Sequence, residues 1–148
     1  MPTPNHAVAQ AASPPVVVLV QDHVDTSEMY SDFLNFSGFR ALRTGDADEG
    51  FDLAVHFAAA VVVTDFWLAG NPSGSHLCNR LKHDNRTRHI PTLLLTGSSQ
   101  RKQVEASLAA GCAIVRMTPY LPDALAHDIR ALIAHKPVEP WPTEHGER

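Results

Sequence analysis

The stretch from residue 61 to residue 74 reads VVVTDFWLAGNPSG, in which three valines lead into a carboxylate and then into a turn-forming segment. A continuous β-branched run of this kind is typical of a strand buried on both faces of a parallel sheet. Asp65 then lies at the carboxyl end of that strand, where open α/β sheets place their ligand crevice. A carboxylate there either caps the following turn or carries function, and this stretch by itself favours neither.

The composition indicates an ordinary single-domain protein. The chain has 148 residues, is 44% hydrophobic and carries a net charge of -4, which gives no argument for nucleic-acid or anionic-membrane partners. It contains no apolar run long enough to span a membrane and no secretory signal. Cys78 and Cys112 are far apart in sequence and lack metal-site spacing, so we expect two reduced thiols in a cytoplasmic protein.

The two ends of the chain differ in composition from its middle. Residues 1–15 are rich in Ala, Pro, Ser and Asn, and residues 136–148 hold three prolines without apolar periodicity. Both segments are predicted to be flexible tails. The folded domain is therefore expected to cover residues 16–135.

Strand-like and helix-like segments alternate five times within that domain. Strands are expected at 16–20, 39–43, 61–65, 90–95 and 113–117, and helices between Asp25 and Gly38 and at 49–58, 75–83, 100–110 and 122–134. The first helix is expected to turn Met29, Tyr30, Phe33, Leu34 and Phe36 toward the core. The alternation predicts a doubly wound, five-stranded parallel sheet with helices on both faces.

Polar side chains follow four of these strands. They are Asp22, Asp65, Thr96 and Thr118. Right-handed crossovers place the carboxyl ends of parallel strands at one edge of the sheet, so these four residues are expected to meet in one crevice. Asp22 by itself would be interpreted as a helix cap, but the other polar residues expected at the same edge favour a role in a functional site.

At this point the sequence resembles a response-regulator receiver domain, over nearly all of residues 16–134. The resemblance rests on VLVQD at 18–22, TD at 64–65 with Gly70 and Gly74, LLTG at 94–97, AAGC at 109–112, and TP at 118–119 followed by LPD at 121–123. It implies the flavodoxin-like receiver fold, which accepts a phosphoryl group from a partner histidine kinase onto an aspartate.

The resemblance also assigns roles to individual residues. Asp65 matches the phosphoacceptor, and Asp22 matches a direct Mg²⁺ ligand. Trp67 matches the residue whose backbone carbonyl binds the metal ion. Thr96 matches the hydroxyl residue that contacts the phosphoryl group, and Pro119 matches the proline after the active-site lysine.

Three positions depart from the family pattern. Gln21 replaces the first acid of the acidic pair, Thr118 replaces the lysine, and Val115 replaces a common aromatic switch residue. A neutral Gln21 oxygen predicts weaker Mg²⁺ binding. Loss of the lysine removes a charge-assisted contact worth about 1.5–3 kcal/mol. We therefore expect weakened phosphorylation and a small or non-standard switching response.

Two side-chain questions stay open at this stage. The first is whether another cation reaches the position of the missing lysine, for which the candidates are Lys82, Arg101 and Arg116. Trp67, beside the acceptor, either shields an aspartyl phosphate from water or covers an empty pocket.

The favoured function is a stand-alone receiver in a two-component phosphorelay. Its partners would be a sensor histidine kinase or phosphotransfer protein and a downstream protein. A homodimer through the fourth helix, fifth strand and fifth helix is a further expectation. The alternative is a pseudo-receiver, which binds proteins without phosphoryl transfer.

An enzyme is not expected. A dehalogenase-type phosphatase needs a second acid at the position of Trp67, and a flavodoxin needs a phosphate loop after the first strand, where Gln21-Asp22-His23 stands.

Overall fold

Strands and helices alternate along the chain in the computed structural model, which describes residues 13–68 and 73–141. The strands are β1 (Val16–Val20), β2 (Arg40–Thr44), β3 (Val61–Asp65), β4 (Thr92–Thr96) and β5 (Ile114–Met117). The helices are α2 (Val24–Phe36), α3 (Ala47–His56), α4 (Gly74–Lys82), α5 (Arg101–Ala110) and α6 (Pro122–Ile133). The predicted elements are confirmed, with boundaries that move by a few residues at most.

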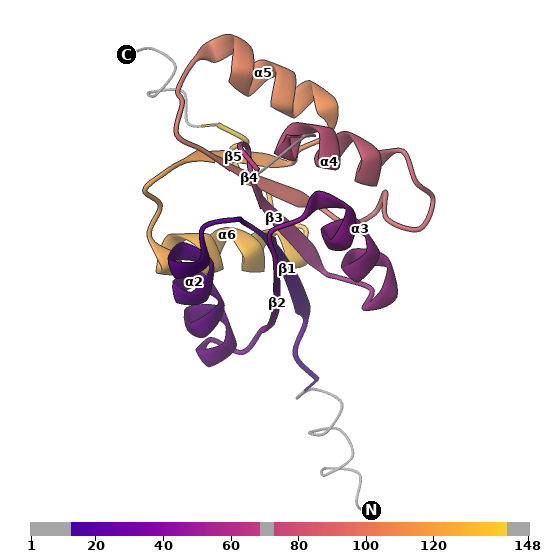
Figure 1. The fold of residues 1–148 in the computed structure, drawn as a ribbon, viewed down its shortest axis with the longest axis vertical. Helices are drawn as coiled ribbons and strands as arrows, with labels where there is room; N and C mark the ends of the chain where they lie inside the picture. The colour runs from indigo at the N-terminus through magenta and orange to yellow at the C-terminus, as the bar shows by residue number, and fades with distance from the viewer. Residues whose placement is uncertain (1–12, 69–72, 142–148) are drawn as a thin grey trace, which may run out of the picture.

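The strands form one parallel sheet in the order β2-β1-β3-β4-β5. Alternate side chains of each strand face opposite layers, as a strand's two-residue period requires. Val17, Val61 and Leu93 pack with α2 and α6, whereas Val18, Val62 and Leu94 pack with the α3, α4 and α5 layer. Figure 1 shows these two helical layers around the sheet. The doubly wound, flavodoxin-like fold predicted from the alternation is confirmed.

The first helix differs in part from its prediction. Its buried residues are Ser27, Tyr30, Ser31 and Leu34, which follow the i, i+3, i+4, i+7 spacing of one helical face. Met29 is 46% exposed and Phe36 is 89% exposed, so their assignment to the core was wrong. The prediction followed residue type, whereas the position around the helix decides which side chains are buried.

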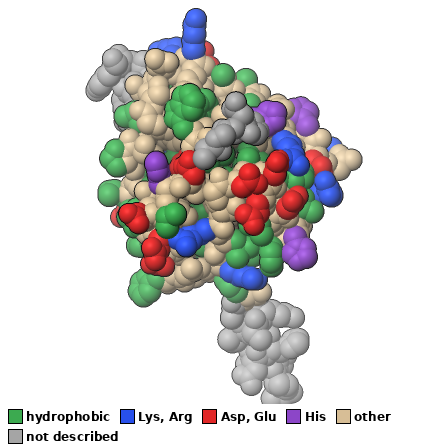
Figure 2. All heavy atoms as spheres, in the orientation of Figure 1, with side chains coloured by type: hydrophobic (Ala, Val, Ile, Leu, Met, Phe, Trp, Pro, Cys, Tyr) green, Lys and Arg blue, Asp and Glu red, His purple; other side chains and the backbone are tan. Residues whose placement is uncertain are grey.

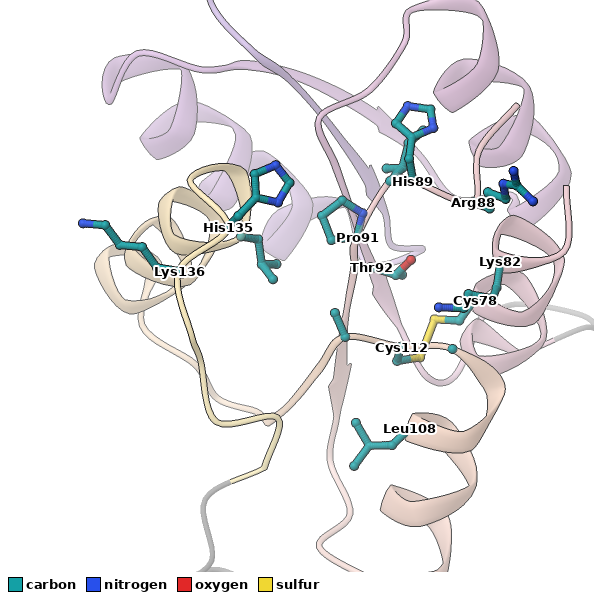
Figure 3. Close-up of a pocket in the computed structure, with 14 residues that line it drawn as sticks. Cys78, Lys82, Arg88, His89, Pro91, Thr92, Leu108, Cys112, His135 and Lys136 are labelled. Carbon is teal, nitrogen blue, oxygen red and sulfur yellow. A yellow bond between two sulfur atoms is a disulfide. The ribbon is translucent and has the colours of Figure 1, made fainter. Parts of the chain in front are cut away.

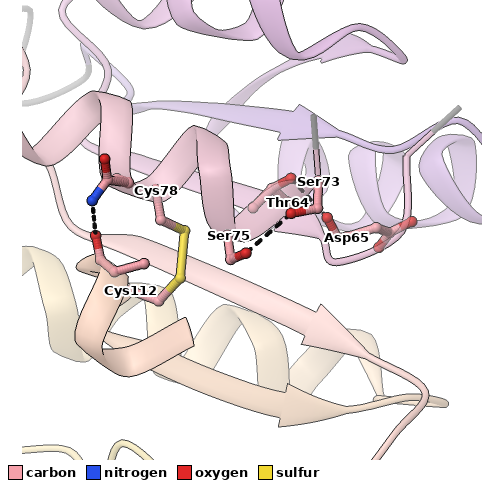
Figure 4. The surroundings of a disulfide bond; sticks show 8 residues. Thr64, Asp65, Ser73, Ser75, Cys78 and Cys112 are labelled. Carbon is pink, nitrogen blue, oxygen red and sulfur yellow. Dashed lines mark hydrogen bonds between the residues drawn. A yellow bond between two sulfur atoms is a disulfide. The ribbon is translucent and has the colours of Figure 1, made fainter. Parts of the chain in front are cut away.

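The two cysteines also correct the sequence analysis. Cys78 on α4 and Cys112 after α5 form a disulfide with their Cα atoms 5.5 Å apart, so the expected free thiols were wrong. Packing of α4 against α5 brings the two residues together, and Asn79 Nδ2 donates to the Ala110 carbonyl beside them at 3.5 Å. Figure 4 shows the disulfide between these two segments. A separation of 34 residues in sequence carried no information about this proximity.

The described part of the expected C-terminal tail lies against the sheet. The Val115 amide donates to the Pro140 carbonyl at 2.8 Å, and Trp141 packs against a buried cluster that includes Val115. Figure 1 shows this yellow end of the chain beside β5. The flexible tail therefore does not begin at residue 136. The expected N-terminal tail lies almost entirely outside the described residues.

Two findings bear on the expected surroundings of the protein. Within residues 13–68 and 73–141, no helix is long and apolar enough to cross a membrane. Figure 2 shows carboxylates gathered over α3, whose first turn carries Asp48 and Glu49 after the N-cap Asp46.

Candidate functional site

A cavity of about 220 Å³ opens at the carboxyl ends of β1, β3, β4 and β5. It is lined by Gln21, His23, Thr26, Asp65, Trp67, Leu95, Thr96, Gly97 and Thr118. The strand-end residues predicted to meet are therefore together, with one qualification. Asp22 is exposed and outside this lining, although its charge still acts on the carboxyl group of Asp65.

The backbone around Asp65 is held from two sides. The Thr64 hydroxyl donates to the Asp65 carbonyl at 3.0 Å, and the Gly74 amide donates to the Phe66 carbonyl at 2.8 Å. A Cβ atom at residue 74 would overlap the carbonyl oxygen of Asp65, so this close approach requires glycine. Figure 4 shows the start of α4 beside Thr64 and Asp65. The position of Asp65 is thus fixed by a helix start packed directly on the strand end.

Gln21 is the direct polar partner of the Asp65 side chain. Its Nε2 group donates to Oδ1 of Asp65 at 3.1 Å. Its Oε1 atom is buried without a hydrogen-bond partner among the described residues. Unpartnered buried carbonyl oxygens are uncommon because they lose their bonds to water. This atom is consequently a ready acceptor or metal ligand beside the carboxylate.

Opposing effects set the pKa of Asp65. Burial, the largest effect, raises the pKa, and the nearby charge of Asp22 raises it further. The hydrogen bond from Gln21 and the charge of His23 lower it, but the net result is a pKa above the usual value. The nucleophilic, ionised form of Asp65 is therefore harder to reach than for an exposed aspartate.

Threonine hydroxyl groups occupy further polar positions of the cavity, which His23 also lines. The Thr96 hydroxyl donates to Oε1 of Gln103 at 3.1 Å and accepts the Ser98 amide at 3.1 Å. The Thr118 hydroxyl points to the Thr96 carbonyl at 3.5 Å, and the following peptide bond to Pro119 is cis. Both threonines line the cavity, at the edge of the sheet where the sequence predicted them, whereas no signal in the sequence pointed to Gln103 in the first turn of α5.

No Lys or Arg lines this cavity among the described residues. Arg116 instead forms a buried ion pair with Asp128 at 3.0 Å and a hydrogen bond to Tyr120. Burial and the Asp128 hydrogen bond raise the pKa of Tyr120 to about 12. Because the Arg116 side chain links β5 to α6 through Asp128, it does not replace the missing lysine.

Trp67 flanks the cavity opening. Trp67 lines the cavity, and its ring contacts the ring of Phe66 edge to face, with the ring centroids 5.0 Å apart. Trp67 is nevertheless 70% exposed. The ring therefore lies beside the opening and remains largely in solvent.

A second cavity, of about 510 Å³, lies at the opposite edge of the sheet, where β4 begins. Figure 3 shows Lys82, His89 and His135 around it, with Thr92 and the disulfide between them. Lys82 lies in the last turn of α4, where a cation complements the helix dipole, and His135 follows the end of α6. Lys82 is therefore placed too far round the molecule to serve the Asp65 site.

These features define a class: a doubly wound receiver-like α/β domain with an acidic residue on β3 and hydroxyl residues on β4 and β5. The family model of the response regulator receiver domain matches residues 17–130, and the chain belongs to this family. Receiver domains of response regulators act in two-component signalling.

Curated relatives support the same conclusion. The polar-differentiation response regulator DivK of Brucella anthropi is 28% identical over 99 residues, which cover 67% of this chain and 80% of DivK. The DNA-binding dual master transcriptional regulator RpaA of Synechocystis is 26% identical over 133 residues, covering 90% of this chain and 55% of RpaA.

Solved structures share the fold. A putative response regulator from Chloroflexus aurantiacus matches with a TM-score of 0.76 and 23% identity, covering 82% of this chain and 99% of that one. The chemotaxis response regulator CheY4 of Vibrio cholerae matches with a TM-score of 0.74 and 18% identity, covering 81% and 99%.

Proposed function

We propose that this receiver accepts a phosphoryl group on Asp65, more slowly than its family pattern would allow, from a histidine kinase or phosphotransfer protein. The supporting observation is the cavity at the carboxyl edge, where the Asp65 carboxylate lies with the Thr96 and Thr118 hydroxyls. A carboxylate held in a small open cavity beside hydroxyl donors has the groups that phosphoryl transfer requires.

The reaction itself is a displacement at phosphorus. A carboxylate oxygen of Asp65 attacks the phosphorus of the donor, and the bond from phosphorus to the donor's nitrogen or oxygen breaks. The donor atom keeps the electron pair, and an acyl phosphate forms on Asp65. Raising the pKa of Asp65 lowers the ionised fraction toward acidic pH but leaves a better nucleophile where the group is ionised.

The residues at the cavity suit a magnesium ion. Asp65 and the neighbouring Asp22, which lies outside the cavity lining, would supply carboxylates, and the Trp67 carbonyl and the unpartnered Gln21 Oε1 would supply neutral oxygens. Because Gln21 stands where the family pattern has an acid, the site would offer two carboxylates, and we expect weak binding. When bound, Mg²⁺ would neutralise charge on the phosphoryl oxygens.

Two hydrogen bonds at the site bear on phosphorylation. Gln21 Nε2 occupies one oxygen of the acceptor, and the Thr96 hydroxyl is donated to Gln103. To contact a phosphoryl oxygen, the Thr96 hydroxyl must rotate away from Gln103. Thr118 offers only a neutral hydroxyl where the family has a cation, so the charge-assisted contact is lost. Weak switching follows, because fewer groups respond to the phosphate.

A phosphorylation-independent pseudo-receiver is the second candidate. Its supporting observation is the Gln21–Asp65 hydrogen bond, which gives the carboxylate a partner without metal or phosphate. In that case the chain acts as a protein-interaction module, and a homodimer through α5, β5 and α6 is one form such a module takes.

Intact-mass measurement after incubation with acetyl phosphate and Mg²⁺ distinguishes the two candidates. The phosphoacceptor predicts a mass gain of one phosphoryl group that disappears in Asp65→Asn and persists in Asp32→Asn, an exposed aspartate on α2. Absence of the gain at every donor and Mg²⁺ concentration would leave the pseudo-receiver as the function.

A further inference from the structure

The outer edge of β5 is covered by the chain's own C-terminal segment, residues 137–141. In the sheet order, β5 pairs with β4 on one side and has no strand on the other. A free edge presents unpaired amides that must find a partner. The Val115 amide finds it in the Pro140 carbonyl at 2.8 Å, which also accepts from Nη1 of Arg116 at 3.4 Å.

Two side chains attach the segment to opposite faces of the sheet. Val138 packs against the cluster that α2 and α6 form on one face. Trp141 packs against the cluster on the other face, which contains Val115 and the disulfide of Cys78 and Cys112. The segment therefore straddles the edge of β5 as an added strand would, with an apolar side chain on each side.

The attachment differs from that of a regular added strand. Pro137 and Pro140 have no amide hydrogen, so the segment lacks the donors for a regular ladder with β5. Glu139 and Pro140 are exposed, and Val138 and Trp141 are only half-buried. The backbone of the segment offers β5 the Pro140 carbonyl, and the side chains of Val138 and Trp141 pack on the two faces of the sheet.

We propose that residues 137–141 are an intramolecular ligand of the β5 edge, which is a binding surface for an extended segment. The surface consists of the outer side of β5 and the apolar cluster that receives Trp141. A partner protein reaches it by displacing the chain's own segment with one of the same chemistry, extended and carrying an aromatic side chain after a proline. This proposal does not depend on phosphorylation of Asp65.

The surface also contacts the candidate site. Phe66, which directly follows Asp65, packs against the same cluster as Trp141. The residue after Asp65 and the residue that attaches the segment therefore share one apolar cluster.

A labelled peptide added to the full-length chain tests the proposal. The probe is a fluorescein-labelled peptide of residues 136–148, followed by anisotropy with the native chain, Trp141→Ala and Glu139→Ala. Trp141→Ala empties the apolar site and should bind the peptide at least about tenfold more tightly than the native chain. Glu139→Ala is the matched control, because Glu139 is exposed, and it should bind like the native chain. A peptide carrying Trp141→Ala should bind none of them.

Hydrogen exchange at the Val115 amide provides the second measurement. The amide is expected to exchange faster in Trp141→Ala than in the native chain or in Glu139→Ala. Equal exchange in all three chains, or equal peptide affinity for native and Trp141→Ala chains, would overturn the proposal.

Discussion

The carboxyl group of Asp65 lies among neighbours that act on its pKa in opposite directions. Burial and Asp22 raise it, while Gln21 and His23 lower it, and burial dominates. The folded chain therefore binds a proton at Asp65 more readily than the unfolded chain does. Ionisation of Asp65 therefore lowers the free energy of unfolding. This destabilisation is fully present at a pH above the pKa of Asp65 in the folded chain, and it is absent at a pH below the pKa of Asp65 in the unfolded chain.

Asp65→Asn should consequently stabilise the protein at pH 7. The gain corresponds to about 1.4 kcal/mol for each unit by which the native pKa is raised, and it should shrink as the pH falls toward the unfolded pKa near 4. Denaturant unfolding at several pH values measures it, with Asp32→Asn as the exposed control. A loss of stability in Asp65→Asn at pH 7 would show that the Gln21 hydrogen bond outweighs the cost of burial.

At the scale of elements, the disulfide joins two parts that are also held by side-chain packing and by the hydrogen bond from Asn79 to the Ala110 carbonyl. Cys78 belongs to α4, whose start packs on Asp65, and Cys112 follows α5 and is buried beside Val115. The bond therefore restrains the helix whose start packs on Asp65. It also gives the pair a redox chemistry that the sequence spacing did not indicate.

Reduction of this disulfide should destabilise the fold by about 2–4 kcal/mol, because the bond closes a loop of 34 residues in the unfolded chain. Denaturant unfolding with and without a reductant measures the effect, and the Cys78→Ser/Cys112→Ser chain should match the reduced protein. Alkylation followed by intact mass reports the free thiols. Two reactive thiols in the folded, unreduced protein would contradict the bond.

At the scale of the whole molecule, the sequence predicted the sheet because the central strands β1, β3 and β4 carry continuous apolar runs and all five strands alternate with helical periods. It also predicted that Asp65, Thr96 and Thr118 share an edge, since parallel topology brings strand ends together. It could not predict the Cys78–Cys112 bond or the packing of residues 137–141 against β5. Those contacts depend on how helices pack in space, which has no local pattern.

The same limit applies to the charges. The position of Arg116 on the last strand made it a candidate for the place of the lysine. Its side chain instead forms an ion pair with Asp128 of α6. Residue type alone does not reveal on which side of the sheet a side chain finds its partner. The replaced lysine therefore leaves a cavity without a cation among its described lining residues.

The most direct test of the account compares phosphorylation rates of the native chain and of Gln21→Asp/Thr118→Lys, with acetyl phosphate and Mg²⁺, by intact mass over time. The account predicts slow, Asp65-dependent phosphorylation of the native chain. It predicts a rate roughly tenfold to a hundredfold higher in the double variant, from a restored contact of about 1.5–3 kcal/mol. Equal rates in the two chains, or phosphorylation of neither, would contradict it.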